Sequence, residues 1–205
     1  MSLKNEISET INDIELHVKT GEIEEAKKIL STLENIPDIT QKIEQLHIEC
    51  KYVLLLQGAY ERDDFRACYE ILDLHSSLKS TQLGELLEKH WSKIMQKCEE
   101  FALRGNIKDI KKTLGTLIDL PSRDNKIGDL LRVSFHVRVS TLLDKKEYKG
   151  AEAIIYTYID IFGHDNEIDT LMKKFEKKSR RKLAITQFQK RPTRESWRES
   201  DIIMK

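Results

Sequence analysis

Histidine and cysteine are the side chains of this sequence whose spacing could support metal binding or catalysis. His47 and Cys50 are three residues apart and would share one face of a helix. A zinc site needs three or four ligands, and no other His or Cys falls at a matching short spacing. His75 and His136 occupy positions that are apolar elsewhere in the chain's repeats, so we expect half-buried core histidines there. We therefore predict no metal site and no cofactor.

Motifs for catalysis are absent from the sequence. The eight glycines are isolated, so no glycine-rich phosphate loop is present, and neither Gly-x-Ser-x-Gly nor His-Glu-x-x-His occurs. Asp and Glu are abundant, but on exposed helices they are ordinary solvated groups. We therefore predict that the chain is not an enzyme and has no catalytic residues.

A run of basic residues near the C-terminus is a candidate binding surface. Residues 173–205 hold 12 Lys/Arg and 4 Asp/Glu, a net charge of +8, which leaves −8 for the rest of the chain. Through residues 173–194 this segment could attract nucleic acid or an anionic membrane surface. Leu171 and Phe175 recur at helical spacing, however, so a capping helix could instead bury them and leave the lysines in water. The candidate basic patch consists of Lys173, Lys174, Lys177, Lys178, Arg180, Arg181 and Lys182.

The last residues, 191–205, form a polar tail with few apolar side chains before its end. Trp197 in this tail could anchor another protein, fold back onto the body, or belong to a disordered segment.

Composition favours long helices with much exposed surface. Hydrophobic residues make up 39% and charged residues 34%, against roughly 45–50% and about 25% in average domains. The longest apolar run, Tyr52–Leu56, is far too short for a transmembrane helix, and the polar N-terminus does not resemble a secretory signal. The odd number of distant cysteines predicts free thiols and a cytoplasmic location.

Similar residues recur along the chain with a period of about 42. Ile23, Phe65, Ile107 and Tyr148 are separated by 42, 42 and 41 residues. Two further columns follow three and seven residues later: Ala26, Cys68, Ile110 and Ala151, then Leu30, Leu72, Leu114 and Ile155. Such a period predicts stacked units that cannot bury their apolar faces alone.

The pattern predicts two helices in each unit. Turn signals at Gly21, Asp63-Asp64 and Gly105-Asn106 precede the second helices, and Pro37 and Pro121 should end two of them. We place the longer first helices near 4–19, 40–60, 81–103 and 125–144, and a capping helix near 166–189. Their predicted core columns include Ile14, Leu56, Cys98 and Val139, and also Val18, Tyr60, Ala102 and Leu143.

The second helices resemble those of tetratricopeptide-type helical repeats, which have the form Gly-x-aromatic-x-x-Ala with a proline soon after. Gly21-Glu-Ile23-Glu-Glu-Ala26, followed by Pro37, is similar to this form, as is Tyr148-Lys-Gly-Ala151. The family's period is 34 rather than 42. The resemblance implies an all-α, right-handed solenoid of four helical hairpins, at about 3–38, 39–79, 80–122 and 123–165, with residues 166–190 as a basic capping helix.

A second candidate surface lies on the first helices, beside the columns that packing keeps apolar. The neighbouring columns vary between repeats, and the plainer interpretation is that they face solvent. Apolar residues among them favour a peptide-binding groove instead. The candidate groove residues are Asn12, Leu54, Gln57, Gln96, Glu99, Val133 and Val137.

From these features we expect a non-enzymatic adaptor or scaffold that binds a protein or peptide in the groove. Nucleic-acid or anionic-surface binding through the basic segment is one alternative. A chaperone for a secreted or assembling partner is another, because small tetratricopeptide-like proteins resemble such chaperones in size. Self-association through an exposed end of the array is also open.

Overall fold

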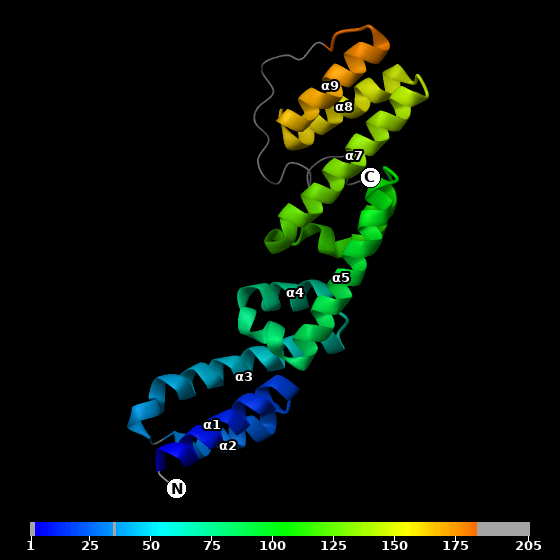
Figure 1. Cartoon of the computed structure of the whole chain (residues 1–205). Coiled ribbons are helices and arrows are strands. Elements are labelled where there is room, and N and C mark those ends of the chain that lie inside the picture. Colours follow the sequence, from blue (N-terminus) through cyan, green and yellow to red (C-terminus); the bar gives the residue numbers. More distant parts are fainter. Residues whose placement is uncertain (1–2, 35, 184–205) are drawn as a thin grey trace. The chain divides into compact units, whose positions relative to one another are not determined.

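The computed structural model describes residues 3–34 and 36–183, and within these ranges it contains helices and no strands (Figure 1). The long first helices begin and end within about two residues of their predicted positions. They are α1 (Leu3–Thr20), α3 (Thr40–Glu61), α5 (Gln82–Ala102) and α7 (Asp124–Asp144). The second helices are α2 (Ile23–Leu33), α4 (Phe65–Leu74), α6 (Ile107–Leu114) and α8 (Tyr148–Phe162), and α9 (Asn166–Ser179) follows them. The predicted all-α fold class is confirmed.

The four turns between first and second helices share one backbone geometry. Gly21, Asp63, Gly105 and Lys146 all take left-handed conformations, with φ of 85°, 55°, 67° and 60°. In each turn this residue's N–H donates to the carbonyl three residues back, and the next residue's N–H donates to the carbonyl five residues back. This is the Schellman pattern that closes a helix C-terminus. The sequence period therefore extends to the backbone hydrogen bonds of all four turns.

Three of the core columns predicted from the period are buried throughout, whereas the column of Ile23, Phe65, Ile107 and Tyr148 is half-buried at Phe65 and Tyr148. Every member of three columns has an exposed fraction of 2% or less: Ile14, Leu56, Cys98 and Val139; Ala26, Cys68, Ile110 and Ala151; Leu30, Leu72, Leu114 and Ile155. Tyr60 is an exception, since it was expected in the core but is exposed and packs edge-on against Phe65, with ring centroids 6.2 Å apart.

The prolines do not end the second helices. α2 ends at Leu33 and α6 at Leu114, several residues before Pro37 and Pro121. Both prolines instead begin short 3₁₀ helices, η1 (Pro37–Ile39) and η4 (Pro121–Arg123), because the fixed φ of proline suits a first helical position. Two more 3₁₀ segments, η2 (Ser76–Ser80) and η3 (Gly115–Asp119), follow α4 and α6.

Contacts divide the chain into two compact units, Met1–Ser92 and Lys93–Lys205, with the boundary inside α5. In the first unit α2 packs against α1 and α3, and α4 packs against α3. The start of α5 joins this unit through Tyr69, whose hydroxyl donates to the Leu87 carbonyl at 3.0 Å and whose ring meets Trp91 at 5.4 Å.

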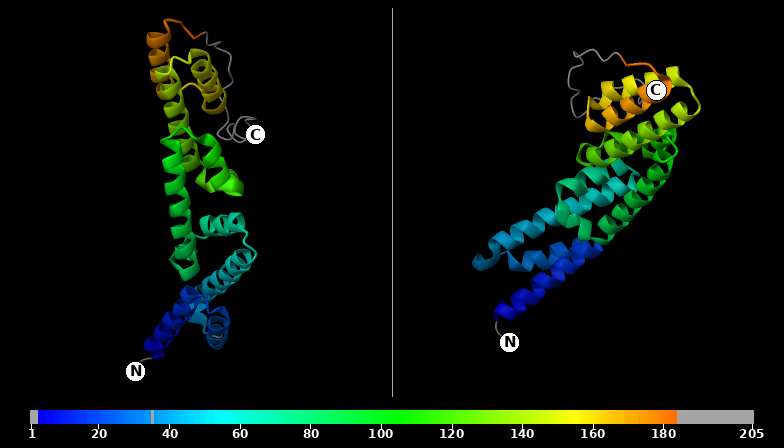
Figure 2. Two further views of the ribbon diagram at one scale, coloured as in Figure 1. Left: turned by 90° about the vertical axis from the view of Figure 1, so that its right-hand side faces the viewer. Right: turned by 45° about the horizontal axis from the view of Figure 1, so that its top comes forward.

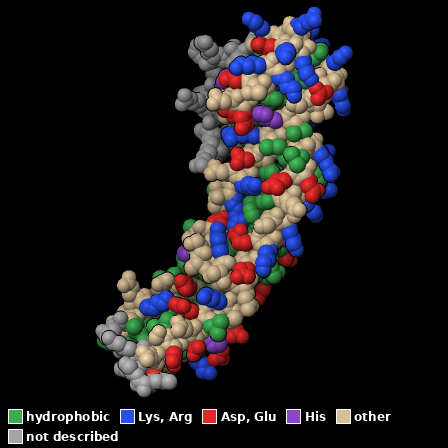
Figure 3. Space-filling view, in the orientation of Figure 1, with side chains coloured by type: hydrophobic (Ala, Val, Ile, Leu, Met, Phe, Trp, Pro, Cys, Tyr) green, Lys and Arg blue, Asp and Glu red, His purple; other side chains and the backbone are tan. Residues whose placement is uncertain are grey.

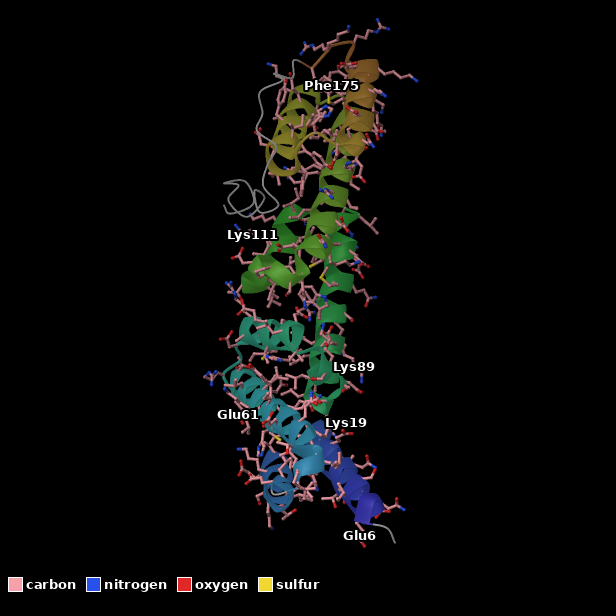
Figure 4. The ribbon with its side chains drawn as sticks, turned by 90° about the vertical axis from the view of Figure 1, so that its left-hand side faces the viewer. Glu6, Lys19, Glu61, Lys89, Lys111 and Phe175 are labelled. Atoms are coloured by element: carbon pink, nitrogen blue, oxygen red, sulfur yellow. The ribbon has the colours of Figure 1, made fainter. Side chains whose placement is uncertain are left out.

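In the second unit α7, α8 and α9 pack against one another (Figure 2). Phe175 of α9 is buried and contacts Tyr148 of α8, with ring centroids 6.5 Å apart (Figure 4). α9 ends at Ser179, about ten residues before the predicted end, and Arg180 takes the left-handed conformation that closes it. Residues 184–190 of the predicted capping segment, the tail 191–205 and Trp197 lie outside the described residues.

Candidate functional site

A cavity of about 300 Å³ opens in the second unit between the end of α5 and the start of α7. The lining positions step by 3 and 1 residues at the end of α5 and by 3, 1 and 3 along α7, a spacing that keeps them on one face of each helix. The lining residues are Glu99, Ala102 and Leu103 from α5 and the turn after it, and Lys126, Asp129, Leu130 and Val133 from α7.

The cavity has an apolar floor and two exposed apolar side chains at its edge. Ala102 and Leu130 form the floor and are buried, with exposed fractions of 1% and 5%. Leu103 and Val133 are exposed to 69% and 42%. Exposed aliphatic side chains beside a buried apolar floor leave apolar area whose burial would be favourable.

Charged groups surround this apolar centre. The Lys126 ammonium lies 2.9 Å from a Glu99 carboxylate oxygen, and both side chains are about half exposed. Asp129 lies 3.7 Å from Arg132, one turn along α7. Because these ion pairs remain in contact with water, they contribute little to stability and frame the apolar centre of the cavity.

The predicted groove residues are distributed over both units. Glu99 and Val133 line the cavity, whereas Gln96 is exposed on α5, Val137 is half-buried on α7, and neither lines it. The other three belong to the first unit: Asn12, Leu54 and Gln57. Of these, Asn12 and Leu54 are exposed, and Gln57 donates a hydrogen bond to the Gly21 carbonyl at 2.9 Å. The Gln57 side-chain amide therefore stabilises the turn between α1 and α2.

Sequence reasoning missed five lining residues. Ala102 was assigned to the core, which is correct for its burial but hides its place at the cavity floor. Leu103 belongs to a variable column, and a leucine at a solvent-facing position was a signal for this site. The remaining three, Lys126, Asp129 and Leu130, lie in the first turns of α7, where no column had been assigned.

The predicted basic patch lies on the outer face of α9 and just beyond it, and all seven side chains are exposed. Lys174 donates to the Ser140 hydroxyl at 3.0 Å, and Lys178 forms an ion pair with Asp144 of α7. This ion pair lowers the pKa of the Asp144 carboxyl. The apolar residues Ile168, Leu171 and Phe175 are buried on the opposite side of the helix. The lysines thus flank a helix that is docked through its apolar face.

The histidines and cysteines singled out in the sequence do not come together as a site. His47 is exposed and lies 3.6 Å from Glu34, whereas Cys50 is buried, so the two do not share a surface. His136 is half-buried between Tyr158, with ring centroids 5.6 Å apart, and Glu167, at 3.6 Å. All three cysteines are free and buried, and burial raises the pKa of each thiol.

Among residues 3–34 and 36–183, no three His, Cys, Asp or Glu side chains come together as a group that could hold a metal ion. In the same part of the chain, no helix combines the length and the apolar character that crossing a bilayer would require.

Comparisons with known proteins gave no relative. No family model matches the chain, and none of the curated proteins or solved structures compared with it is significantly similar. The resemblance to tetratricopeptide-type repeats therefore stays a prediction from the sequence.

Proposed function

We propose that this chain is a non-enzymatic protein-binding module whose cavity between α5 and α7 takes an apolar side chain of a protein or peptide partner. The observation that carries the proposal is the exposure of Leu103 and Val133 beside the buried floor of Ala102 and Leu130. Covering exposed aliphatic surface contributes about 25 cal/mol per Å², which favours an apolar ligand group at this position.

The size of the cavity supports a single anchoring side chain. A volume of about 300 Å³ is at the lower end of the range of roughly 300–1,000 Å³ for small-molecule sites. Protein interfaces often derive most of their energy from one large apolar side chain in such a pocket, surrounded by polar contacts. The Lys126–Glu99 pair and Asp129 supply polar contacts at this rim.

A repeat architecture provides the wider setting for this proposal. We infer that the four helical hairpins form a tetratricopeptide-like, right-handed solenoid, with α9 covering its last hairpin. The four equivalent turns and the three fully buried columns support this arrangement. In such arrays first helices line the binding surface, and both walls of the cavity come from first helices.

Peptides selected from a random library against the wild-type chain provide the test. Leu103→Asp combined with Val133→Asp places two carboxylates beside the apolar floor, and we expect the selected peptides to lose about tenfold or more in affinity. Leu74→Asp is the matched control, because Leu74 is an exposed leucine on α4, 78% accessible, and does not line the cavity. Peptides that bind the double variant as tightly as the wild type would place the binding site elsewhere.

A further inference from the structure

The last turn of α9 lies beside the turn between α7 and α8 in the second unit. Lys178 pairs with Asp144, Lys174 donates to Ser140 at 3.0 Å, and the Phe175 ring meets Tyr148 at 6.5 Å. These contacts fix the end of α9 against the end of α7 and the first turn of α8. Residues about 30 positions apart in the sequence therefore form one surface.

Three further lysines join the predicted basic patch at this surface. Lys145 and Lys146 follow directly after Asp144, and Lys149 follows Tyr148 in the first turn of α8. All three are exposed. We name residues 144–149 together with 173–182 the basic end. It holds ten Lys/Arg and three Asp/Glu, a net charge of +7, and Figure 3 shows Lys and Arg gathered at the top of the view, over α9 and the α7–α8 turn.

The basic end is cationic and exposes no large hydrophobic residue. The large hydrophobic residues that are exposed in the described ranges all lie outside it. Phe175 is buried and Tyr148 is half-buried against it. A surface that inserts into a bilayer needs exposed apolar side chains, and single-strand binding uses exposed aromatic rings on which bases stack. Neither is present in the described part of the basic end.

Within residues 3–34 and 36–183, most of these cations have no carboxylate partner. Lys178 pairs with Asp144, whereas in the described part of the chain no carboxylate pairs with Lys145, Lys146, Lys149, Lys173 or Lys177. Closely spaced cations on a folded surface are complementary in charge to a ligand with closely spaced phosphate groups. Duplex DNA carries one negative charge per about 1.7 Å of helix axis.

We propose that the basic end binds the phosphate backbone of a nucleic-acid duplex without reading its base sequence. Lysine ammonium groups contact phosphate oxygens as point charges, and such contacts carry no sequence information. Binding releases counterions, so it weakens steeply as salt rises. This surface is separate from the α5–α7 cavity, so either proposal can fail without the other.

The test is a titration of a fluorescent DNA duplex of about 20 base pairs with the full chain, at salt concentrations from about 50 to 200 mM. We expect log K to fall with log salt by about 0.9 for each phosphate contacted, and the affinity to be the same for two unrelated sequences. The variant Lys145→Gln, Lys146→Gln and Lys149→Gln should lose about tenfold in affinity and flatten the slope by about 2 to 3. These three lysines test the proposed surface because they belong to the α7–α8 turn and the start of α8, and not to the basic run of α9.

Lys93→Gln, Lys97→Gln and Lys108→Gln form the control, since they remove three exposed lysines of the same unit from outside the basic end. Control and test variants are both checked for native helicity. Equal binding by the two triple variants would overturn the proposal, as would binding that does not respond to salt. Tighter binding to a single strand of the same length, or to phosphatidylserine vesicles, would also overturn it.

Discussion

Lys126 at the start of α7 forms an ion pair with Glu99 near the end of α5, with 2.9 Å between nitrogen and oxygen. Lys42 of α3 and Glu15 of α1 form the same pair at 2.7 Å. Each member of the first pair lies 84 residues, or two repeat periods, after its counterpart. The repeat therefore preserves a contact between first helices as well as the turns and the core. Between the third and fourth repeats, this Lys–Glu contact lies at the rim of the proposed binding cavity.

The left-handed residue in each turn allows the repeated turn conformation to be tested by mutation. Lys146 holds φ of 60° where two of the other turns have glycine. Left-handed geometry costs a non-glycine residue about 1 kcal/mol, so Lys146→Gly should raise the free energy of unfolding by about that amount. Lys145→Gly is the control, because Lys145 has φ of −79° and gains nothing from glycine. Chemical denaturation measures both, and equal effects would contradict the assigned turn.

Gly84 and Gly128 should respond to alanine in opposite directions. A Cβ on Gly84 would lie 2.9 Å from the Lys79 Cα and closer still to the Leu78 carbonyl, so α5 would have to move away from η2. Gly84→Ala should therefore cost about 3 kcal/mol. A Cβ on Gly128 would meet no atom within 4 Å, so Gly128→Ala should stabilise α7 by about 0.5–1 kcal/mol. Thermal unfolding of the two variants gives the comparison, and effects of the same sign would refute this packing.

Asp165 holds the start of α9 and also satisfies a buried tyrosine. One carboxylate oxygen accepts from the Glu167 and Ile168 N–H groups at 3.1 and 2.8 Å, and the other accepts from the Tyr158 hydroxyl at 2.8 Å. Asp165→Ala removes both functions and should destabilise the second unit by about 2–3 kcal/mol. Asp165→Asn retains a capping oxygen and should cost much less. Loss of similar size in both variants would show that the cap is not the cause.

The buried thiols predict a loss of stability at alkaline pH. Burial raises the pKa of Cys68 and Cys98 to about 11, whereas the pKa of a thiol in the unfolded chain is about 8.5. Between these values the unfolded state binds fewer protons than the native state, so the free energy of unfolding falls as pH rises. At pH values below the pKa of the unfolded thiol, the two thiols are protonated in both states and contribute fully to the free energy of unfolding.

Urea unfolding between about pH 8 and 10.5 measures this effect. Lysines titrate in the same range, so the combined Cys68→Ala and Cys98→Ala variant serves as the reference. The stability difference between wild type and variant should shrink as pH increases. A difference that stays constant across the range would mean that the two thiols are not protected by burial.

Much of the fold follows from the sequence because one period fixes many positions at once. Once Ile23 and Phe65 define the start of a second helix, the period places the later starts at Ile107 and Tyr148, where the structure has them. The helix ends deviate from the period where single glycine or proline residues determine the local backbone conformation. Gly115, with φ of 52°, ends α6 early, and Pro121 begins η4 instead of ending the preceding helix.

The site was harder to predict than the fold. Variable columns identified Glu99 and Val133 as surface positions, but a cavity depends on how the end of one first helix meets the start of the next. That relationship involves Lys126 and Leu130, which occupy early turns with no assigned column. The 84-residue spacing of the Lys–Glu pairs was present in the sequence and would have pointed to this contact. The joining of the α7–α8 turn lysines with α9 needed the structure, because no sequence pattern connects those two segments.

Methyl NMR of the full chain during titration with a small probe that carries methyl groups, such as isopropanol, tests the central claim most directly. If the α5–α7 cavity is a preformed apolar binding site, saturable shifts should appear first at the methyl groups of Leu103, Leu130 and Val133. The exposed leucines Leu16 and Leu74, which do not line the cavity, should shift only weakly and without saturation. Equal, unsaturable shifts at all five residues would contradict the proposal that this cavity binds a partner's side chain.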